Sequence, residues 1–254
     1  MLPAKPLEQQ LRRLKGAIAT AEQFGAAAAR PLGIAAIDAA LGGGLAGGAL
    51  HELAAVAPFH CGATAGFALA LAALSRETRK ETLWIATDFG LTETGALYGP
   101  GLDQFGLASA RLLIVRVARS VDALFAMEEA LKCRALASVV AELDPAPDLT
   151  ATRRLALAAR EGGGLGLLLR PKADGAPSSA ATRWQVAARP SAPDELGGLG
   201  RTSFSLALTR NRRGPCGAWT LAWDHHEHAF AALSLGVAEA ACDRPDRAPL
   251  ERAG

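Results

Sequence analysis

Residues 55–66, AVAPFHCGATAG, occupy the place where a phosphate-binding loop would join a strand to a helix, between the apolar run LHELAAV and the helical pattern FALALAALSRE. A phosphate-binding loop reads G-x-x-x-x-G-K-[ST]: the glycine backbones curl around the phosphates, the lysine reaches the β- and γ-phosphates, and the hydroxyl holds Mg²⁺. Gly62 and Thr64 retain the second glycine and the hydroxyl, whereas Ala57 and Ala63 replace the first glycine and the lysine. The stretch therefore has the position of a nucleotide site without all of its chemistry.

The alanine at position 63 supplies neither a charge nor a hydrogen-bond donor. Phosphoryl transfer is catalysed mainly by charge stabilisation, and loss of one such group costs on the order of 2.7–4 kcal/mol. We therefore predict no catalytic residue here and no ATP or Mg²⁺ cofactor, with the loop serving only to turn a strand into a helix. Weak nucleotide binding at Gly62 and Thr64 stays open, because a helix starting near Ala65 would offer free N–H groups.

Histidines gather in the stretch DHHEH, from Asp224 to His228. A zinc site needs a closed set of ligands with defined spacing, and no other histidine or cysteine lies nearby in the sequence. The stretch therefore predicts a polar turn, and we expect no metal. The cysteines are far apart and form no C-x-x-C pair, which indicates reduced thiols rather than a disulfide framework; they are Cys61, Cys133, Cys216 and Cys242.

The composition is that of a globular α/β domain, with 50% hydrophobic and 20% charged residues among 254. A net charge of +2 argues against wholesale neutralisation of phosphates, and 5% aromatic residues argue against a base-stacking platform. The N-terminal sequence MLPAKPLEQQLRRLKG has no apolar core of a signal peptide, and the apolar stretches are interrupted within about 12 residues. We therefore predict a cytoplasmic protein that does not contact a membrane.

Residues 7–24 have apolar side chains at spacings of three and four, which predicts an amphipathic helix with one narrow apolar stripe. The stripe consists of Leu7, Leu11, Leu14, Ile18 and Ala21. Gly25 and the alanines that follow predict a flexible joint. We expect residues 1–30 to form this helix and a linker, with Leu7, Leu11 and Leu14 contacting either the chain's own core or a partner.

Strands and helices alternate through residues 31–171, which predicts a mostly parallel sheet with helices on both faces. The expected elements are a helix over 33–44 ended by glycines, a strand near 49–56, a helix over 65–76, a strand over 82–88 followed by a long loop, a strand over 111–118, a helix over 120–136, a strand over 137–143, a helix from Leu149 to a glycine, and a strand over 164–171. The expected core spans residues 31–229.

The last part of the chain has a different pattern. Residues 172–200 are rich in Pro, Ala, Ser, Gly and Asp, which predicts a mobile loop around one strand, ATRWQVAAR. Residues 204–224 alternate in polarity around an Arg- and Gly-rich turn, which predicts an antiparallel hairpin added to the sheet edge, with tryptophans packing on the sheet. The tail, residues 230–254, is expected to start as a helix and to be partly disordered.

Residues 33–54, GIAAIDAALGGGLAGGALHELA, resemble the opening of the RecA-like recombinases, G-x-x-x-L-D-x-x-L-G-G-G-(L)-x-x-G-x-(hydrophobic)-x-E-(hydrophobic). The matching residues are Gly33, Ile37, Asp38, Leu41, Gly42, Gly43, Gly44, Gly48 and Glu52. Within that superfamily, the N-terminal helix, the ALHEL strand, the LTRNRRG turn and the WTLAWD strand resemble the ImuA family, the RecA-like accessory proteins of bacterial inducible-mutagenesis cassettes. The resemblance covers roughly residues 30–225 and implies a RecA-like core.

The resemblance also implies positions for ATPase carboxylates. RecA-type ATPases carry a glutamate after the second strand to orient the attacking water; here Asp88 is one methylene shorter, and its plainer interpretation is a cap or turn residue. The position that binds Mg²⁺ falls near Glu142, with Asp144 two residues on. Without the lysine there is little reason to expect Mg²⁺ at these carboxylates.

The densest basic cluster of the chain is Arg210, Asn211, Arg212 and Arg213. In RecA-type filaments a basic pair in this hairpin reaches the nucleotide of the adjacent subunit, and Arg210 and Arg212, two apart on a strand, would project to the same side. Three interpretations of this cluster stay open: it contacts a neighbouring RecA subunit, it contacts a DNA backbone, or it is a solvated turn with no role.

The resemblance implies a role in the DNA-damage (SOS) response. The ImuA family is associated with an inactive Y-family polymerase relative and an error-prone replicative-type polymerase in translesion synthesis. We therefore expect a non-catalytic adaptor that binds RecA or the RecA filament, these polymerase subunits, or DNA. The alternatives are a RecA-like cell-division inhibitor and a weak DNA-dependent ATPase.

Overall fold

The computed structural model describes residues 29–75, 80–191, 193, 198 and 200–233. The helix predicted over residues 7–24, with Leu7, Leu11 and Leu14, lies outside the described residues, as does the chain from position 234. Two predictions therefore stay predictions. They are the boundaries of the core at residues 30 and 229, and the mobile loop over 172–200. Within the described residues, no helix is long and apolar enough to cross a membrane.

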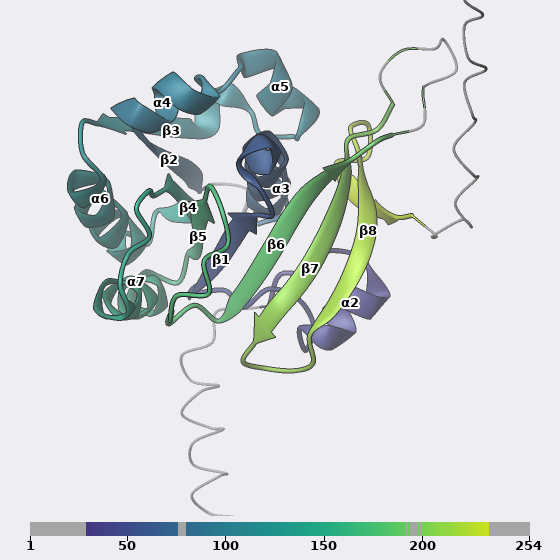
Figure 1. The fold of residues 1–254 in the computed structure, drawn as a ribbon. Coiled ribbons are helices and arrows are strands. Elements are labelled where there is room, and N and C mark those ends of the chain that lie inside the picture. Colours follow the sequence, from purple (N-terminus) through teal and green to yellow (C-terminus); the bar gives the residue numbers. More distant parts are fainter. Residues whose placement is uncertain (1–28, 76–79, 192, 194–197, 199, 234–254) are drawn as a thin grey trace, which may run out of the picture.

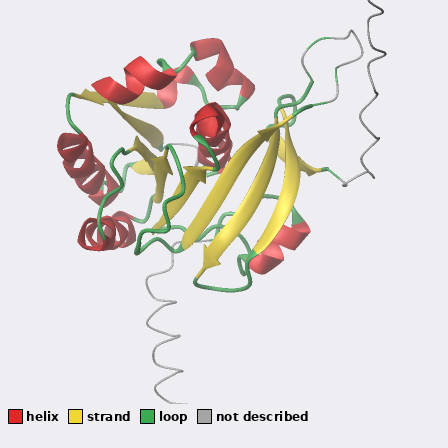
Figure 2. Ribbon diagram, in the orientation of Figure 1, coloured by secondary structure: helices red, strands yellow, loops and turns green. Residues whose placement is uncertain are grey.

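A nine-stranded sheet runs through the molecule in the order β3-β2-β4-β5-β1-β6-β7-β8-β9. The strands from β3 to β6 are parallel, whereas β7, β8 and β9 are added antiparallel. Figure 2 shows the strands as one twisted sheet with helices around it. The bounds are β1 Ala49–Ala55, β2 Glu81–Thr87, β3 Leu112–Val117, β4 Leu136–Glu142, β5 Leu165–Arg170, β6 Thr182–Arg189, β7 Ser203–Asn211, β8 Gly217–Asp224 and β9 Ala229–Ala232.

Helices cover both faces of the parallel part of the sheet (Figure 1). Side chains of α2 and α3 belong to one buried cluster, and those of α6 and α7 belong to another cluster on the opposite face. The bounds are α2 Ala35–Ala40, α3 Cys61–Leu74, α4 Asp88–Thr94, α5 Gly99–Gln104, α6 Ser120–Lys132 and α7 Leu149–Gly162, with 3-10 turns η1 Pro58–His60 and η2 Ser109–Arg111. This confirms the predicted α/β fold class and is consistent with a RecA-like core.

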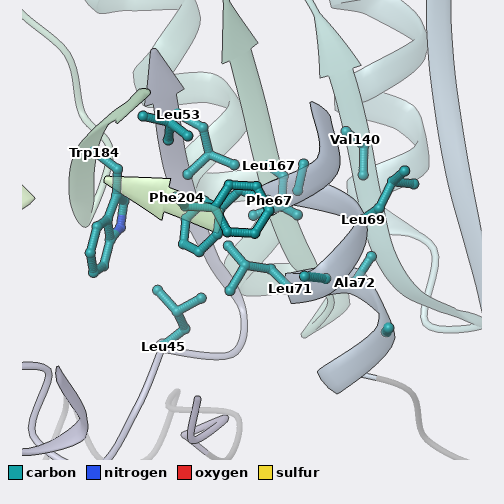
Figure 3. Packing of buried hydrophobic residues seen from close by; sticks show 14 of the residues in the cluster. Leu45, Leu53, Phe67, Leu69, Leu71, Ala72, Val140, Leu167, Trp184 and Phe204 are labelled. Carbon is teal, nitrogen blue, oxygen red and sulfur yellow. The ribbon is translucent and has the colours of Figure 1, made fainter. Parts of the chain in front are cut away.

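The larger core is organised around Phe67 of α3 (Figure 3). The Phe67 ring centroid lies 5.9 Å from that of Phe204, 6.0 Å from Trp184 and 5.6 Å from Phe230. Aromatic pairs at such separations contribute beyond their buried area. The packing role predicted for the tryptophans is confirmed, since Trp184 and Trp223 are buried in this core and Trp219 packs against it.

The glycines after α2 permit a sharp return of the chain. Gly42, Gly43 and Gly44 all have positive φ, which L side chains rarely adopt. A Cβ on Gly44 would lie 2.4 Å from the carbonyl carbon and oxygen of Arg30, so the backbones there approach too closely for any side chain. This confirms the prediction that the glycines end the helix.

Three local predictions are wrong. The long loop expected after the second strand contains α4 and α5, because Thr87 accepts a hydrogen bond from the Gly90 N–H and starts a helix that is too short to show periodicity. The helix expected over 120–136 ends at Lys132, since Cys133 is already extended and Leu136 opens β4. The helix expected after residue 229 is instead β9, which pairs with β8.

Candidate functional site

The strand-to-helix junction that resembles a phosphate loop runs directly from β1 through the 3-10 turn η1 into α3. The helix begins at Cys61, not near Ala65 as expected, so Gly62 and Thr64 lie in its first turn. An anion-binding nest is built from successive N–H groups with alternating right- and left-handed backbone. No residue between positions 55 and 66 has positive φ, so this junction does not form such a nest.

The hydroxyl of Thr64 is turned away from a metal-binding role. Thr64 is 2% exposed, and its Oγ1 donates a hydrogen bond to the carbonyl of His60, 3.1 Å away. A Cβ added to Gly62 would meet nothing within 4 Å, so packing within the chain does not require a glycine there. The two residues that retain the phosphate-loop pattern thus behave as ordinary residues of a helix's first turn.

A cavity of about 410 Å³ lies next to this junction, at the carboxyl ends of β2, β4 and β5. In open α/β sheets this edge is where ligands bind. Its walls are largely apolar, and the half-buried Glu142 also lines it. Burial, and then the charge of Asp144, raise the pKa of the Glu142 carboxyl. The cavity therefore presents a partly desolvated carboxyl group to any ligand.

Both arginines that line this cavity are already paired. Arg116 of β3 donates to the carboxylate of Asp88, and Arg170 of β5 forms ion pairs with Glu52 and Asp174. A nucleotide polyphosphate in this cavity would have to compete with these carboxylates for the two arginine side chains. The position expected to orient an attacking water, Asp88, is the first residue of α4 and is held by Arg116.

The basic cluster predicted at residues 210–213 lies at the end of β7 and in the turn that follows. Arg210 donates through Nη1 to the carbonyl of Ser178 at 2.6 Å. Asn211 donates to the carbonyls of Ala40 at 2.8 Å and Pro215 at 3.1 Å, which anchors the turn to α2. The turn thus exposes Arg212 and Arg213 on an anchored backbone.

The structure does not bring the two predicted sites together. Thr182 at the start of β6 pairs with His51 near the start of β1 and with Asn211 at the end of β7, so the basic turn lies at the amino ends of the parallel strands. The junction with Gly62 and Thr64 follows the carboxyl end of β1 (Figure 1). The cavity of this chain therefore lies out of reach of Arg210, Arg212 and Arg213, which cannot contact a ligand in it.

The DHHEH stretch forms the turn between β8 and β9. The Asp224 carboxylate accepts hydrogen bonds from the N–H groups of His226 and Glu227, as a polar turn residue does. Among the described residues, no group of three or more His, Cys, Asp or Glu side chains could hold a metal ion. Cys61, Cys133 and Cys216 are free thiols.

Two surfaces were not found from the sequence. The strand β3 is an edge of the described sheet, and it exposes 50% of Leu113 and 57% of Ile114. A groove of about 460 Å³ runs beside α7, and its lining includes Arg153, Arg160 and Arg212. The seven-residue spacing of the first two arginines was visible on the predicted helix, but the contribution of Arg212 depends on tertiary structure.

Comparison with known proteins supports the resemblance drawn from the sequence. The chain is 39% identical over 153 residues to Protein ImuA of Caulobacter vibrioides, in strains NA1000 / CB15N and ATCC 19089 / CIP 103742 / CB 15. The match covers 54% of this chain, and the chain spans 62% of the length of these curated relatives. No family model matches the chain.

Proposed function

From its similarity to Protein ImuA, we propose that this chain acts in a bacterial inducible-mutagenesis cassette as a non-catalytic adaptor that supports error-prone translesion DNA synthesis. Its proposed partners are RecA or the RecA filament, a Y-family polymerase-like subunit, an error-prone replicative-type polymerase, and DNA. Its proposed place of action is the cytoplasm, where these partners act on the chromosome.

The observation that carries the proposal is the junction between β1 and α3. It keeps the position of a nucleotide loop, but its backbone has no left-handed residue and its Thr64 hydroxyl is bonded to His60. Together with the paired arginines of the neighbouring cavity, this geometry favours a protein that uses its surfaces rather than ATP hydrolysis.

Exposed surfaces support the adaptor role. Within the described sheet, β3 has no neighbouring strand on its outer side and exposes half of Leu113 and Ile114, and such edges readily accept a partner. The basic turn with Arg212 and Arg213 is a second exposed surface, with the charge expected for contact with an anionic partner.

The adaptor proposal predicts that the purified full chain captures RecA filaments or the Y-family polymerase-like subunit in a pull-down. Binding to at least one is expected because the chain exposes apolar and basic surfaces that nothing in its described part covers. Capture of neither would refute the proposal. Overexpression that gives filamentous cells without changing the mutation frequency would instead support a cell-division inhibitor.

We also predict that Ala63→Lys will not create ATPase activity. The lysine restores one charge, but the missing nest, the bonded Thr64 hydroxyl and the paired arginines remain. The measurement is release of radiolabelled phosphate from ATP with single-stranded DNA, for the wild type and the variant, against an active RecA control. Hydrolysis by the wild type would support the weak-ATPase alternative, and hydrolysis by Ala63→Lys alone would show that only the lysine was missing.

A further inference from the structure

The groove beside α7 has an apolar wall that packs against nothing in the described chain. Leu149, Arg153, Leu157 and Arg160 follow one another at spacings of three or four along the helix and line this groove. Leu149 is 48% exposed and Leu157 is 59% exposed, whereas Leu155 points into the core. Besides the apolar face that holds it on the sheet, the helix therefore carries an exposed row in which two leucines alternate with two arginines.

Three arginines line the groove together with these leucines. Arg153 and Arg160 lie about 10 Å apart along the helix axis, at a rise of about 1.5 Å per residue. Arg212 approaches from the end of β7, and its backbone N–H donates to the carbonyl of Ala181 in the opposite wall. None of the three side chains belongs to an ion pair within the described residues.

The nearby carboxylates are directed elsewhere. Asp148 caps α7 by accepting from the Ala151 N–H, and Glu128 of α6 pairs with Arg154 on the other side of the helix. No Asp or Glu of the described chain lines the groove. Burial, and then repulsion by Arg210, lower the pKa of the Arg212 guanidinium, so an anion placed beside it would relieve a local excess of positive charge.

We infer that the groove formed by Leu149, Leu157, Arg153, Arg160 and Arg212 docks a segment of a partner protein that carries acidic side chains around apolar anchors. The inference rests on the proposed adaptor function and names the chemistry of one partner. Charge complementarity provides the carboxylates for the arginines, and the exposed leucines provide contacts for the anchors.

Nucleic acid fits this surface less well. Phosphates are bound by cationic and polar groups, and exposed leucines between the arginines would gain nothing from a phosphate backbone. The chain's own N-terminal segment also fits poorly by charge. Residues 1–28 contain Lys5, Arg12, Arg13 and Lys15 against only Glu8 and Glu22. The occupant is therefore expected from another protein.

Fluorescence anisotropy with the full chain tests the inference. The probes are three labelled peptides of about 15 residues with helix-forming sequences, built from Leu with Glu, Leu with Lys, or Ser with Glu. We expect only the Leu and Glu peptide to bind. Arg153→Gln with Arg160→Gln, and separately Leu157→Ser, should each weaken binding at least about tenfold, the loss typical of truncating important interface residues.

The matched control is Arg154→Gln, which removes an arginine of the same helix outside the groove and should leave binding unchanged. No binding of the Leu and Glu peptide, or equal binding to the groove variants, would overturn the inference. Equal binding of the Ser and Glu peptide would do so as well. Binding of a single-stranded oligonucleotide that needs the arginines but not Leu157 would assign the groove to nucleic acid instead.

Different results would refute the groove inference and the adaptor proposal. If the wild type captures RecA filaments or the polymerase-like subunit and the groove variants capture them equally, without peptide binding, then the groove inference is wrong and the adaptor proposal stands. If the wild type captures neither protein but still binds the Leu and Glu peptide through Arg153 and Leu157, then the adaptor proposal is wrong while the groove's chemistry is retained.

Discussion

Glu52→Leu is expected to lower the free energy of unfolding by about 3–5 kcal/mol, because it removes the buried partner of an ion pair and leaves the buried Arg170 paired only with the partly exposed Asp174. Glu52 is 2% exposed and accepts hydrogen bonds through Oε1 from Arg170 at 2.7 Å and from Arg183 at 2.9 Å. Arg170 is itself only 5% exposed, so water cannot replace the lost carboxylate. The measurement is urea unfolding of the full chain at neutral pH.

Two further variants separate the buried charge from the loss of any ion pair. Asp174→Ala removes the other carboxylate that pairs with Arg170, but this carboxylate is partly exposed, so the expected loss is about 1 kcal/mol or less. Glu52→Leu with Arg170→Met removes both buried charges and should regain much of the stability lost in Glu52→Leu, because apolar side chains of similar volume replace buried ion pairs well.

The comparison of these variants decides the role of the pair. If Glu52→Leu costs no more than Asp174→Ala, then Arg170 finds water or another partner, and burial does not make Glu52 essential. If the double variant is as unstable as Glu52→Leu, then the loss comes from packing around Leu50 and Leu168, on the same face of the sheet, rather than from the lost partner of Arg170. Retained helix content by circular dichroism would confirm that each variant is folded when its unfolding is measured.

Local signals in the sequence predicted most of the fold. The helix from Leu149 ends where Gly163 takes a left-handed φ of 79°, a position that glycine occupies without strain. The alternation of strands and helices predicted the parallel sheet, and the alternating polarity of residues 204–224 predicted the added antiparallel hairpin. The order of strands has no local signal, so the strand predicted over 111–118 was found, but its place at the edge of the described sheet was not predicted.

The candidate sites also combine features that local sequence signals predicted with features that only tertiary structure determines. The losses at Ala57 and Ala63 were visible from the residues alone, because the phosphate-loop pattern has fixed spacing. The pairing of the cavity's arginines was not visible: Arg116 and Asp88 are 28 residues apart, and Arg170 and Glu52 are 118 residues apart. Residue types suggested a nucleotide site or its remnant, while long-range contacts determined which charges are available there.

Acidification is expected to destabilise the protein through His51. Burial, and to a lesser extent the charge of Arg213, lower the pKa of His51 from 6.5 to about 4, against the opposing effect of its hydrogen bond to Ala46. The unfolded chain therefore binds more protons than the folded chain between these values, and stability falls as the pH falls through this window. The loss should reach about 2 kcal/mol by about pH 5 and about 3 kcal/mol below about pH 4, at 1.36 kcal/mol per unit.

Hydrogen bonds explain why the folded state holds this histidine neutral. The His51 Nε2 lies 2.9 Å from the Ala46 carbonyl, which can only accept, so Nε2 carries the proton. The Nδ1 lies 2.7 Å from Thr182 Oγ1, which also accepts from Trp184 Nε1 at 2.8 Å and can donate its own proton to Nδ1. Protonation of Nδ1 would remove the acceptor of the Thr182 hydroxyl proton and would place a positive charge in a fully buried site.

The test compares the free energy of unfolding of the wild type and His51→Leu between about pH 7.5 and about pH 5, a range chosen because most carboxylates stay ionised there. The variant is expected to be less stable at neutral pH, because the Thr182 hydroxyl loses its acceptor, but to lose about 2 kcal/mol less on acidification. Arg213→Gln serves as the charge control and should leave most of the pH dependence in place, since burial is the larger cause. An equal pH dependence in the wild type and His51→Leu would assign the acid sensitivity to other groups and remove His51 from the explanation.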